Sequence, residues 1–403
     1  MNITLFETRV AANRLEPIAL TRPVFDLRCG TFTFLERVRR LRPEAAVTLY
    51  VRPELADVTQ ERLPDCSVNP DTPSGGIWLD GGVFWRDDSL RLLEDQPGTA
   101  ISRGGRMLGA NLSAEESQAW LAAGGLLEEP PTVSEEKADV VVVDYLWDCV
   151  HENGDAIRED SRHFSLSEIK GQIDDGVHMI NRGEISVGEG SRMRAGVILD
   201  AESGPVIIGE NVAIEPGAYI EGPVFIGDGS LIKAGAKIFG ETTIGPGCKV
   251  GGEVTESILQ GWCNKQHDGF LGNAYIGEWV NLGAGTNNSD LKNNYTSVKV
   301  TVKGERIDTG SLFVGLFMGD HSKSAIGTLF NTGTVVGPAC NVVTAGFPRR
   351  VIPPFSWVVN GKSKAYAINK FMETAIAAKE RRGHLFSKAE EKLFRWIADQ
   401  INR

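Results

Sequence analysis

Apolar side chains recur every six residues through the middle of the chain. The unbroken series is Ile208, Ile214, Ile220, Ile226, Ile232, Ile238, Ile244 and Val250. Each hexad predicts a short strand with its aliphatic side chain pointing inward and a bend at glycine, proline or asparagine. Three hexads close a triangular coil, and coils stacked about 4.8 Å apart satisfy each other's backbone groups. The pattern therefore predicts a parallel β-helix.

The same phase returns after interruptions, at 276–282 and again at 330–342. We therefore expect the β-helix to span 177–347. A proline-rich exit follows, and apolar stripes predict two helices over 364–382 and 387–402. Residues 348–403 are expected to cap the prism or a neighbouring subunit.

Short aliphatic runs alternate with helical patterns over residues 1–165. Examples of such runs are 45–51 and 76–79, and a capped helix is predicted from Ser113 to Ala123. This mixture predicts an α/β domain. A chain of 403 residues is long enough for two cores and a tail.

The formal net charge of −11 argues against bulk nucleic-acid binding, because a phosphate backbone needs a basic partner. Arginines nevertheless outnumber acidic residues between Arg9 and Arg42, which suits a small anionic ligand. No apolar stretch approaches the roughly 20 residues that cross a bilayer, and the start lacks a signal-peptide pattern. Six cysteines show no CxxC spacing. We expect a cytoplasmic protein with reduced cysteines that does not bind membranes.

The segment Arg14-Leu-Glu-Pro, followed by Thr-Arg22-Pro and Arg28, resembles the signature loop of sugar-1-phosphate nucleotidyltransferases. In that family a basic loop holds a nucleoside triphosphate. The resemblance implies that Arg14, Arg22 and Arg28 bind the nucleotide, since arginine pairs well with phosphate. The family's glycine-rich turn is replaced by residues 7–13, which lack glycine. A surface or subunit-contact role for these arginines therefore stays open.

The same resemblance implies a catalytic Mg²⁺ ion bound near the end of a central strand. Asp80 follows an aliphatic strand where the family has its metal aspartate, and Asp148 is a second candidate. The alternative at both positions is a turn-forming aspartate.

The phase breaks at Asn264-Lys-Gln-His267-Asp-Gly-Phe270-Leu-Gly and resumes with Ile276-Gly-Glu-Trp-Val-Asn281-Leu-Gly-Ala-Gly-Thr. These segments resemble the acetyltransferase half of bifunctional N-acetylglucosamine-1-phosphate uridylyltransferases. The resemblance implies that His267 is the general base and that Asn281 orients the amine or the developing oxyanion. It also implies acetyl-CoA and an amino-sugar 1-phosphate as substrates. Lys265 is then a candidate phosphate contact, and Phe270 replaces the family's substrate-binding tyrosine.

Three further candidates for substrate binding are Lys292, Asn294 and Tyr295. The pair Asn294-Tyr295 matches an Asn-Tyr pair of the family, displaced by an insertion, and the surrounding segments resemble an alternative bacterial branch. Prisms of this family coil left-handed and share acyl sites between subunits, so the resemblance implies a left-handed β-helix and a homotrimer. The expected fold is an α/β nucleotidyltransferase-like (Rossmann-like) domain, a left-handed parallel β-helix and C-terminal helices.

The preferred functional prediction is a sugar-phosphate transferase with both activities, acetyl transfer from acetyl-CoA and nucleotidyl transfer from UTP. Two alternatives remain open: a nucleotidyltransferase whose β-helix serves assembly or regulation, and an acetyltransferase with a degenerate N-terminal domain. A γ-type carbonic anhydrase is disfavoured, because no pair of histidines has the short spacing of its zinc site.

Overall fold

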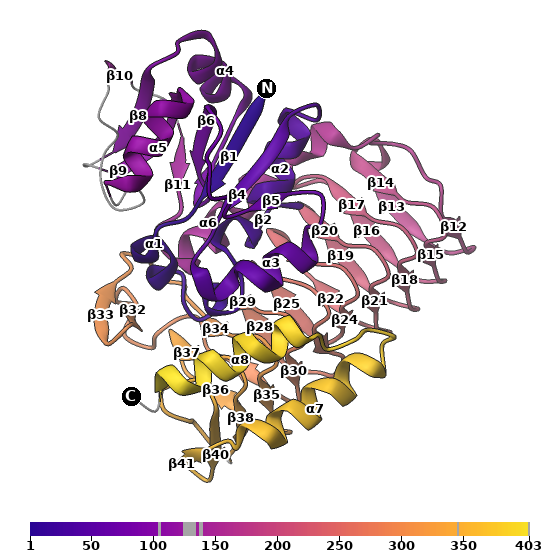
Figure 1. The fold of residues 1–403 in the computed structure, drawn as a ribbon. Helices are drawn as coiled ribbons and strands as arrows, with labels where there is room; N and C mark the ends of the chain where they lie inside the picture. The colour runs from indigo at the N-terminus through magenta and orange to yellow at the C-terminus, as the bar shows by residue number, and fades with distance from the viewer. Residues whose placement is uncertain (104–105, 124–133, 137–139, 345, 402–403) are drawn as a thin grey trace.

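The computed structural model describes residues 1–403 except 104–105, 124–133, 137–139, 345 and 402–403. The described chain forms an N-terminal α/β domain, a parallel β-helix and two C-terminal helices (Figure 1). The α/β domain lies against one side of the prism, and the two helices lie along it further towards the C-terminal coils. The predicted fold class is confirmed.

A seven-stranded sheet in the order β10-β8-β9-β6-β1-β4-β5 forms the centre of the N-terminal domain. Leu5, Leu49 and Leu79 lie in register on three parallel strands, and all three are fully buried. The carboxyl ends of these strands therefore meet at one edge of the sheet. The strands are β1 (Asn2–Phe6), β4 (Ala46–Tyr50), β5 (Ser67–Val68), β6 (Gly76–Asp80), β8 (Thr99–Arg103), β9 (Arg106–Leu112) and β10 (Ser134–Glu136).

Helices surround this sheet and two small antiparallel pairs complete the domain. Ser113 caps α5 as expected: its hydroxyl accepts from the Glu116 amide, and the Glu116 carboxylate accepts from the Ser113 amide. The helices are α1 (Arg9–Arg14), α2 (Phe34–Leu41), α3 (Ala56–Arg62), α4 (Asp87–Asp95), α5 (Ala114–Ala122) and α6 (Leu146–Asp160). The pairs join β2 (Arg28–Cys29) to β3 (Phe32–Thr33) and β7 (Val83–Phe84) to β11 (Val141–Val142).

The β-helix is a left-handed triangular prism with three parallel faces. The first face contains β14 (Ile185–Val187), β17 (Val206–Ile208), β20 (Val224–Ile226), β23 (Thr242–Ile244), β26 (Ile258–Leu259), β29 (Tyr275–Ile276), β34 (Leu316–Met318), β37 (Thr334–Val336) and β39 (Val351–Ile352). The second face contains β12 (Gln172–Ile173), β15 (Arg192–Met193), β18 (Ala213–Ile214), β21 (Leu231–Ile232), β24 (Lys249–Val250), β27 (Asn264–Lys265), β30 (Asn281–Leu282), β35 (Lys323–Ser324), β38 (Asn341–Val343) and β40 (Ser356–Val359), with β41 (Lys362–Ala365) antiparallel at its end.

The third face contains β13 (His178–Ile180), β16 (Ile198–Asp200), β19 (Tyr219–Glu221), β22 (Lys237–Ile238), β25 (Glu253–Thr255) and β28 (Phe270–Gly272), and β31 (Asn287–Asn288) and β36 (Leu329–Phe330) pair beyond them. All eight side chains of the predicted aliphatic series point inward and are buried. Ile214, Ile232 and Val250 lie in register on successive coils, which the six-residue period requires.

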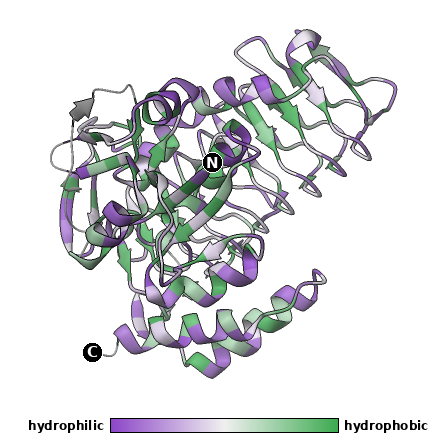
Figure 2. Ribbon diagram, turned by 45° about the horizontal axis from the view of Figure 1, so that its top comes forward, coloured by the Kyte–Doolittle hydropathy of each residue, from purple (hydrophilic) through white to green (hydrophobic). Residues whose placement is uncertain are grey.

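The prism is longer than the hexapeptide phase alone indicated. Its strands begin at Gln172 and continue to Val359, beyond the expected limits of 177 and 347. Val351 and Ile352 pair with Val335 and Val336, so the proline-rich segment forms part of the last coil. Hydrophobic residues are frequent along the strands, whereas the helices carry both hydrophobic and hydrophilic residues (Figure 2).

The N-terminal domain covers the first face of the prism. Ile157 of α6 packs against Ile207 and Phe225, whose side chains point outward from that face. The Tyr275 hydroxyl donates to the Arg28 carbonyl at 2.9 Å, and the Thr243 hydroxyl donates to the Gly30 carbonyl at 2.9 Å. The interface therefore combines apolar burial with hydrogen bonds to the basic segment.

A column of aromatic residues marks the corner between the first and second faces, here called the aromatic corner. Trp262, Trp279, His321 and Phe355 occupy it, with Ala339 on the coil between His321 and Phe355, and all five have a positive φ between 53° and 60°. Such φ values are unusual for bulky side chains. The two C-terminal helices, α7 (Ile368–Glu380) and α8 (Lys388–Ile401), cover this column, and Phe371 and Phe394 pack on the His321 ring. Burial against these helices stabilises the unusual backbone.

No helix within the described part of the chain is both long and apolar enough to cross a membrane.

Candidate functional site

His267 lies at the corner between the second and third faces of the prism, here called the open corner. It follows β27 and precedes β28, and its side chain is exposed. Its imidazole makes no hydrogen bond to any described residue. An exposed, unpaired imidazole can accept a proton from a bound amine, because the ring nitrogens are free to face the ligand.

Lys265 has a different environment from the one expected of a phosphate-binding residue. It occupies an inward position, in register with Val250, and only 3% of its surface is exposed. Its ammonium donates to the carbonyls of Gly251 and His267, both at 2.8 Å. Burial lowers the pKa of Lys265 to about 8. The expected substrate contact is therefore corrected: Lys265 ties the backbone of His267 to the preceding coil.

Asparagines line the second face and the start of the third near His267. The Asn264 amide donates to the Asn281 side-chain oxygen at 2.5 Å on the next coil. On the third face, the Asn287 side chain accepts from the Phe270 amide at 2.7 Å and donates to the Gly285 carbonyl at 2.8 Å. The segment that carries Asn281 and Phe270 is thus held rigidly by amide groups from neighbouring coils.

Lys292, Asn294 and Tyr295 belong to an insertion between β31 and β34. The Lys292 ammonium donates to the Ser297 carbonyl at 2.6 Å, and the Asn294 side chain accepts from the Thr296 hydroxyl at 3.0 Å. Tyr295 is 71% exposed. No ion pair or hydrogen bond among the described residues joins these three side chains to His267 or Asn281.

The same insertion packs against the N-terminal domain. It contains the hairpin β32 (Lys299–Val302) and β33 (Glu305–Asp308). Lys303 pairs with Glu16 at 3.1 Å, and His151 on α6 lies 3.3 Å from the Phe313 carbonyl oxygen. The insertion therefore joins the prism to the α/β domain.

Two of the three predicted nucleotide-binding arginines are buried at the domain interface. The Arg22 guanidinium is enclosed by Asp26, Glu278 and Asp320 at 3.3, 3.1 and 2.7 Å. Arg28 is 8% exposed, and its guanidinium donates to the Thr31 carbonyl at 2.5 Å. The expectation is corrected for both, because carboxylate and backbone partners already occupy them and exclude a triphosphate.

Arg14 remains at the surface of the N-terminal domain. Its side chain is 44% exposed and pairs with Asp144 at 2.8 Å. Asp144 also pairs with Arg106 at 3.1 Å, and Arg106 pairs with Asp80 at 2.7 Å. This alternating chain of charges lies beside the carboxyl end of β6, and Arg14 is its accessible cation.

The two predicted magnesium ligands have other partners. Asp80 is fully buried, accepts from the Gly82 amide at 2.9 Å and pairs with Arg106. The Asp148 carboxylate accepts from the Asp144 and Tyr145 amides at the start of α6. Burial raises the pKa of both carboxyl groups, which disfavours the charged form that Mg²⁺ requires.

The described residues contain no group of three or more His, Cys, Asp or Glu side chains arranged to hold a metal. As placed, neither Asp80 nor Asp148 fits a Mg²⁺ site, and both are corrected to structural roles.

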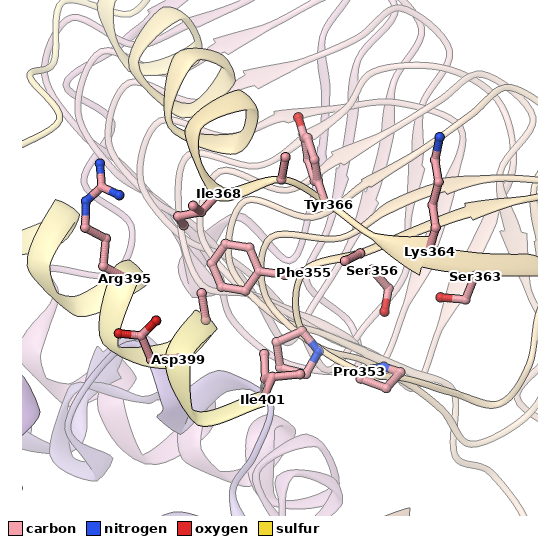
Figure 3. Close-up of a pocket in the computed structure, with 14 residues that line it drawn as sticks. Pro353, Phe355, Ser356, Ser363, Lys364, Tyr366, Ile368, Arg395, Asp399 and Ile401 are labelled. Carbon is pink, nitrogen blue, oxygen red and sulfur yellow. The ribbon is translucent and has the colours of Figure 1, made fainter. Parts of the chain in front are cut away.

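A pocket of about 560 Å³ lies at the C-terminal end of the prism, away from the residues predicted from sequence. Figure 3 shows Phe355 between α8, which carries Arg395 and Asp399, and the β40–β41 hairpin, which carries Ser363 and Lys364. A second pocket of about 300 Å³ lies where the three parts of the molecule meet. Its lining includes Trp262, Trp279, Arg62, Lys379 and Glu390. Neither pocket contains His267 or Asn281.

Three outward side chains on the coils around the candidate residues were not indicated by the sequence pattern: Asn264, Asn287 and Lys323. Each is an outward residue of a parallel strand, in register with the candidate residues or bonded to their segment. The signal that identifies them is positional, since Asn264, Asn281, Lys323 and Asn341 occupy equivalent outward positions on successive coils.

Known proteins resemble both halves of the chain. Residues 3–168 match the family model of sugar nucleotidyl transferases, and residues 205–240 match that of bacterial transferase hexapeptide repeats. The chain therefore combines a domain that matches sugar nucleotidyl transferases with a hexapeptide-repeat β-helix. Within this class it is similar to bifunctional sugar-1-phosphate nucleotidylyltransferase/acetyltransferases, which confirms the resemblance noted in the sequence.

One such protein, from Sulfurisphaera tokodaii, is 39% identical over 136 residues, which are 33% of this chain and 34% of the relative. A protein named bifunctional protein GlmU from Methanocaldococcus jannaschii is 33% identical over 88 residues, or 22% and 21% of the two chains. Another of that name, from Rippkaea orientalis, is 26% identical over 201 residues, or 48% and 36%. The aligned part spans no more than 36% of the length of these relatives.

Proposed function

We propose that this chain is a sugar-phosphate transferase with two activities. In the β-helix, an acetyl group passes from acetyl-CoA to the amine of an amino-sugar 1-phosphate. In the N-terminal domain, a nucleoside triphosphate, with UTP as the expected substrate, transfers its nucleotidyl group to the sugar 1-phosphate. The observation that carries the first activity is the exposed His267 imidazole on the coil of Asn264, whose side chain is hydrogen-bonded to Asn281 on the next coil.

Acetyl transfer requires a neutral amine to attack the thioester carbonyl carbon. His267 accepts the proton that the amine loses as the new C–N bond forms. The C–S bond then breaks, and the CoA thiolate leaves and takes up a proton. Asn281, held by Asn264, donates a hydrogen bond to the oxyanion or orients the amine. Lys265 fixes the backbone at His267, so that the base does not drift from the attacking nitrogen.

Release of thiol from acetyl-CoA, measured against a panel of amino-sugar phosphates, tests this activity. We expect release with at least one member of the panel. Absence of release with every amino sugar would eliminate the acetyltransferase assignment.

For nucleotidyl transfer, Arg14 is the remaining candidate for contact with the triphosphate, because its guanidinium is accessible. A bound Mg²⁺ would supply charge neutralisation of the phosphates, but the side chains of Asp80 and Asp148 do not fit such an ion. Calorimetry with UTP, dTTP and GTP, with and without Mg²⁺, tests nucleotide binding. We expect UTP to bind, and we expect Arg14→Ala to lower the affinity for UTP.

The burial of Arg22, Arg28 and Asp80 specifically favours a second candidate, an acetyltransferase whose N-terminal domain has become structural. Thiol release together with no detectable binding of any nucleotide would establish this alternative over the bifunctional one.

We also propose a homotrimer that forms through the faces flanking the open corner, since the N-terminal domain covers the first face and α7 and α8 cover the aromatic corner. Light scattering tests this assembly. A stable monomer at micromolar concentration would count against a site shared between subunits.

A further inference from the structure

A groove separates α7 from the second face of the prism. Its cavity of about 420 Å³ is lined by Lys323 on β35 and by one side of α7. The lining residues from this side are Glu373, Thr374, Ala377 and Ala378 of α7 and Arg381 directly after it, which recur at the spacing of one helix face. Small side chains at 377 and 378 leave the space open between the cations.

Lys323 belongs to the same row of outward residues as Asn264 and Asn281 of the candidate acetyl-transfer site. It lies in register with Asn281 on the next coil, so the two outward residues are about 4.8 Å apart along the prism axis. Its ammonium donates to the His321 carbonyl at 3.0 Å. Burial lowers the pKa of Lys323 to about 8, and it has no carboxylate partner among the described residues. A partly buried ammonium without a counter-ion favours an anionic ligand.

The other charges around the groove also favour an anionic ligand. Glu373 is the one acidic residue among the described residues that line it, and Lys370 already pairs with Glu373 at 2.9 Å. Arg381 is exposed and makes no ion pair with any described residue. Lys323 and Arg381 therefore leave an excess of positive charge in a cavity on an otherwise acidic protein.

We propose that Lys323 and Arg381 form a phosphate-binding subsite that anchors one of the two substrates of acetyl transfer. The inference rests on the proposed acetyltransferase function. Lysine supplies a point charge, and the arginine fork binds phosphate oxygens in pairs. The phosphate ester belongs to the amino-sugar phosphate or to CoA, whose phosphates lie at the far end of the arm from the thioester. The pairing of Lys323 with Asn281 on adjacent strands places the subsite one coil away from the proposed reacting groups.

Binding measurements test the subsite without reference to turnover. Calorimetry compares two pairs of probes with the full-length protein: glucosamine 1-phosphate against glucosamine, and CoA against pantetheine. In each pair one member lacks the phosphate. In one pair we expect the phosphorylated probe to bind more tightly than its partner without phosphate. Lys323→Gln and Arg381→Gln should each lower the affinity for that phosphorylated probe about 10- to 100-fold, as loss of a charged hydrogen bond predicts. The affected pair identifies the substrate that the subsite holds.

Lys249→Gln is the matched control, because Lys249 occupies the equivalent outward position three coils before Lys323 and lies outside the cavity. Lys323→Arg retains the charge and should preserve most of the affinity. Equal weakening by the Lys249 variant, or unchanged affinity for both phosphorylated probes in the two groove variants, would overturn the subsite. Phosphate-dependent binding without any thiol release would instead contradict the acetyltransferase function and leave the subsite standing.

Discussion

Arg22 of the N-terminal domain lies 2.7 Å from Asp320 of the β-helix, with both side chains almost fully buried. Asp26 and Glu278 also contact the same guanidinium. Burial disfavours each charge alone, whereas the surrounding carboxylates raise the pKa of Arg22 well above its usual value. The arginine expected to bind nucleotide thus joins the two domains.

Replacing Arg22 by Met should destabilise the protein by about 3–5 kcal/mol, because the carboxylates around it lose their counter-ion while remaining buried. Urea unfolding at pH 7 measures the change. Lys392→Ala is the control, since Lys392 also bridges to the N-terminal domain through Asp57 but both side chains are exposed. We expect that control to cost less than about 1 kcal/mol. Similar small losses in both variants would refute the structural role of Arg22.

His267→Ala should lower acetyl-transfer turnover on the order of 100- to 10,000-fold, the usual contribution of a positioned general base. The Michaelis constant for acetyl-CoA should change little, because the base acts mainly in the transition state. Steady-state thiol release measures both quantities. His178→Ala is a matched control, as His178 is another exposed histidine on the prism. Near wild-type turnover of the His267 variant would show that another group removes the proton.

Lys265 should make the stability of the protein depend on pH in a defined window. Its pKa is about 8 in the folded protein, below the ordinary value of 10.5, so the unfolded chain binds more protons between these values. The free energy of unfolding of the wild type, relative to Lys265→Met, should therefore rise from pH 8 towards pH 10.5 and stay level below pH 8. Urea unfolding of both proteins measures this difference. Lys323 is present in both, so its own titration cancels. A difference independent of pH would show that Lys265 is not buried as an ammonium.

Trp279→Ala should destabilise the protein by about 3–5 kcal/mol, as expected for removal of a packed aromatic side chain. The Trp279 ring stacks on Trp262 with centroids 5.4 Å apart and is 8% exposed beneath the C-terminal helices. Tyr295→Ala is the control, because Tyr295 also has a positive φ, 52°, but is 71% exposed. Thermal unfolding measures the loss of stability in both variants, whose replaced residues have similar φ values and differ in burial. Equal losses would mean that packing against α7 and α8 adds little to stability at the aromatic corner.

The order of the prism was predictable because its signal is local and repeated. Each inward position, such as Ile232, needs only its neighbours six residues away to specify a strand. The end of the prism was less predictable. Val351, Ile352 and the following prolines do not continue the phase, yet their backbone groups pair with the preceding coil at Val335 and Val336. Hydrogen bonding between coils depends on which residues lie side by side in space. This pairing cannot be predicted from the sequence once the six-residue period is interrupted.

The candidate site shows the same contrast between features encoded locally in the sequence and features set by neighbours in space. The residues alone identified His267 and Asn281 as candidates for acetyl transfer, because the motifs around them resemble those of a known acetyltransferase. The accessibility of the charged side chains depends instead on the folded arrangement: Arg22 and Lys265 are buried, whereas Lys323 faces a cavity under α7. The physical reason is that a charged side chain acquires its role from the elements that remove water around it. For these residues those elements lie up to 298 positions away in the chain.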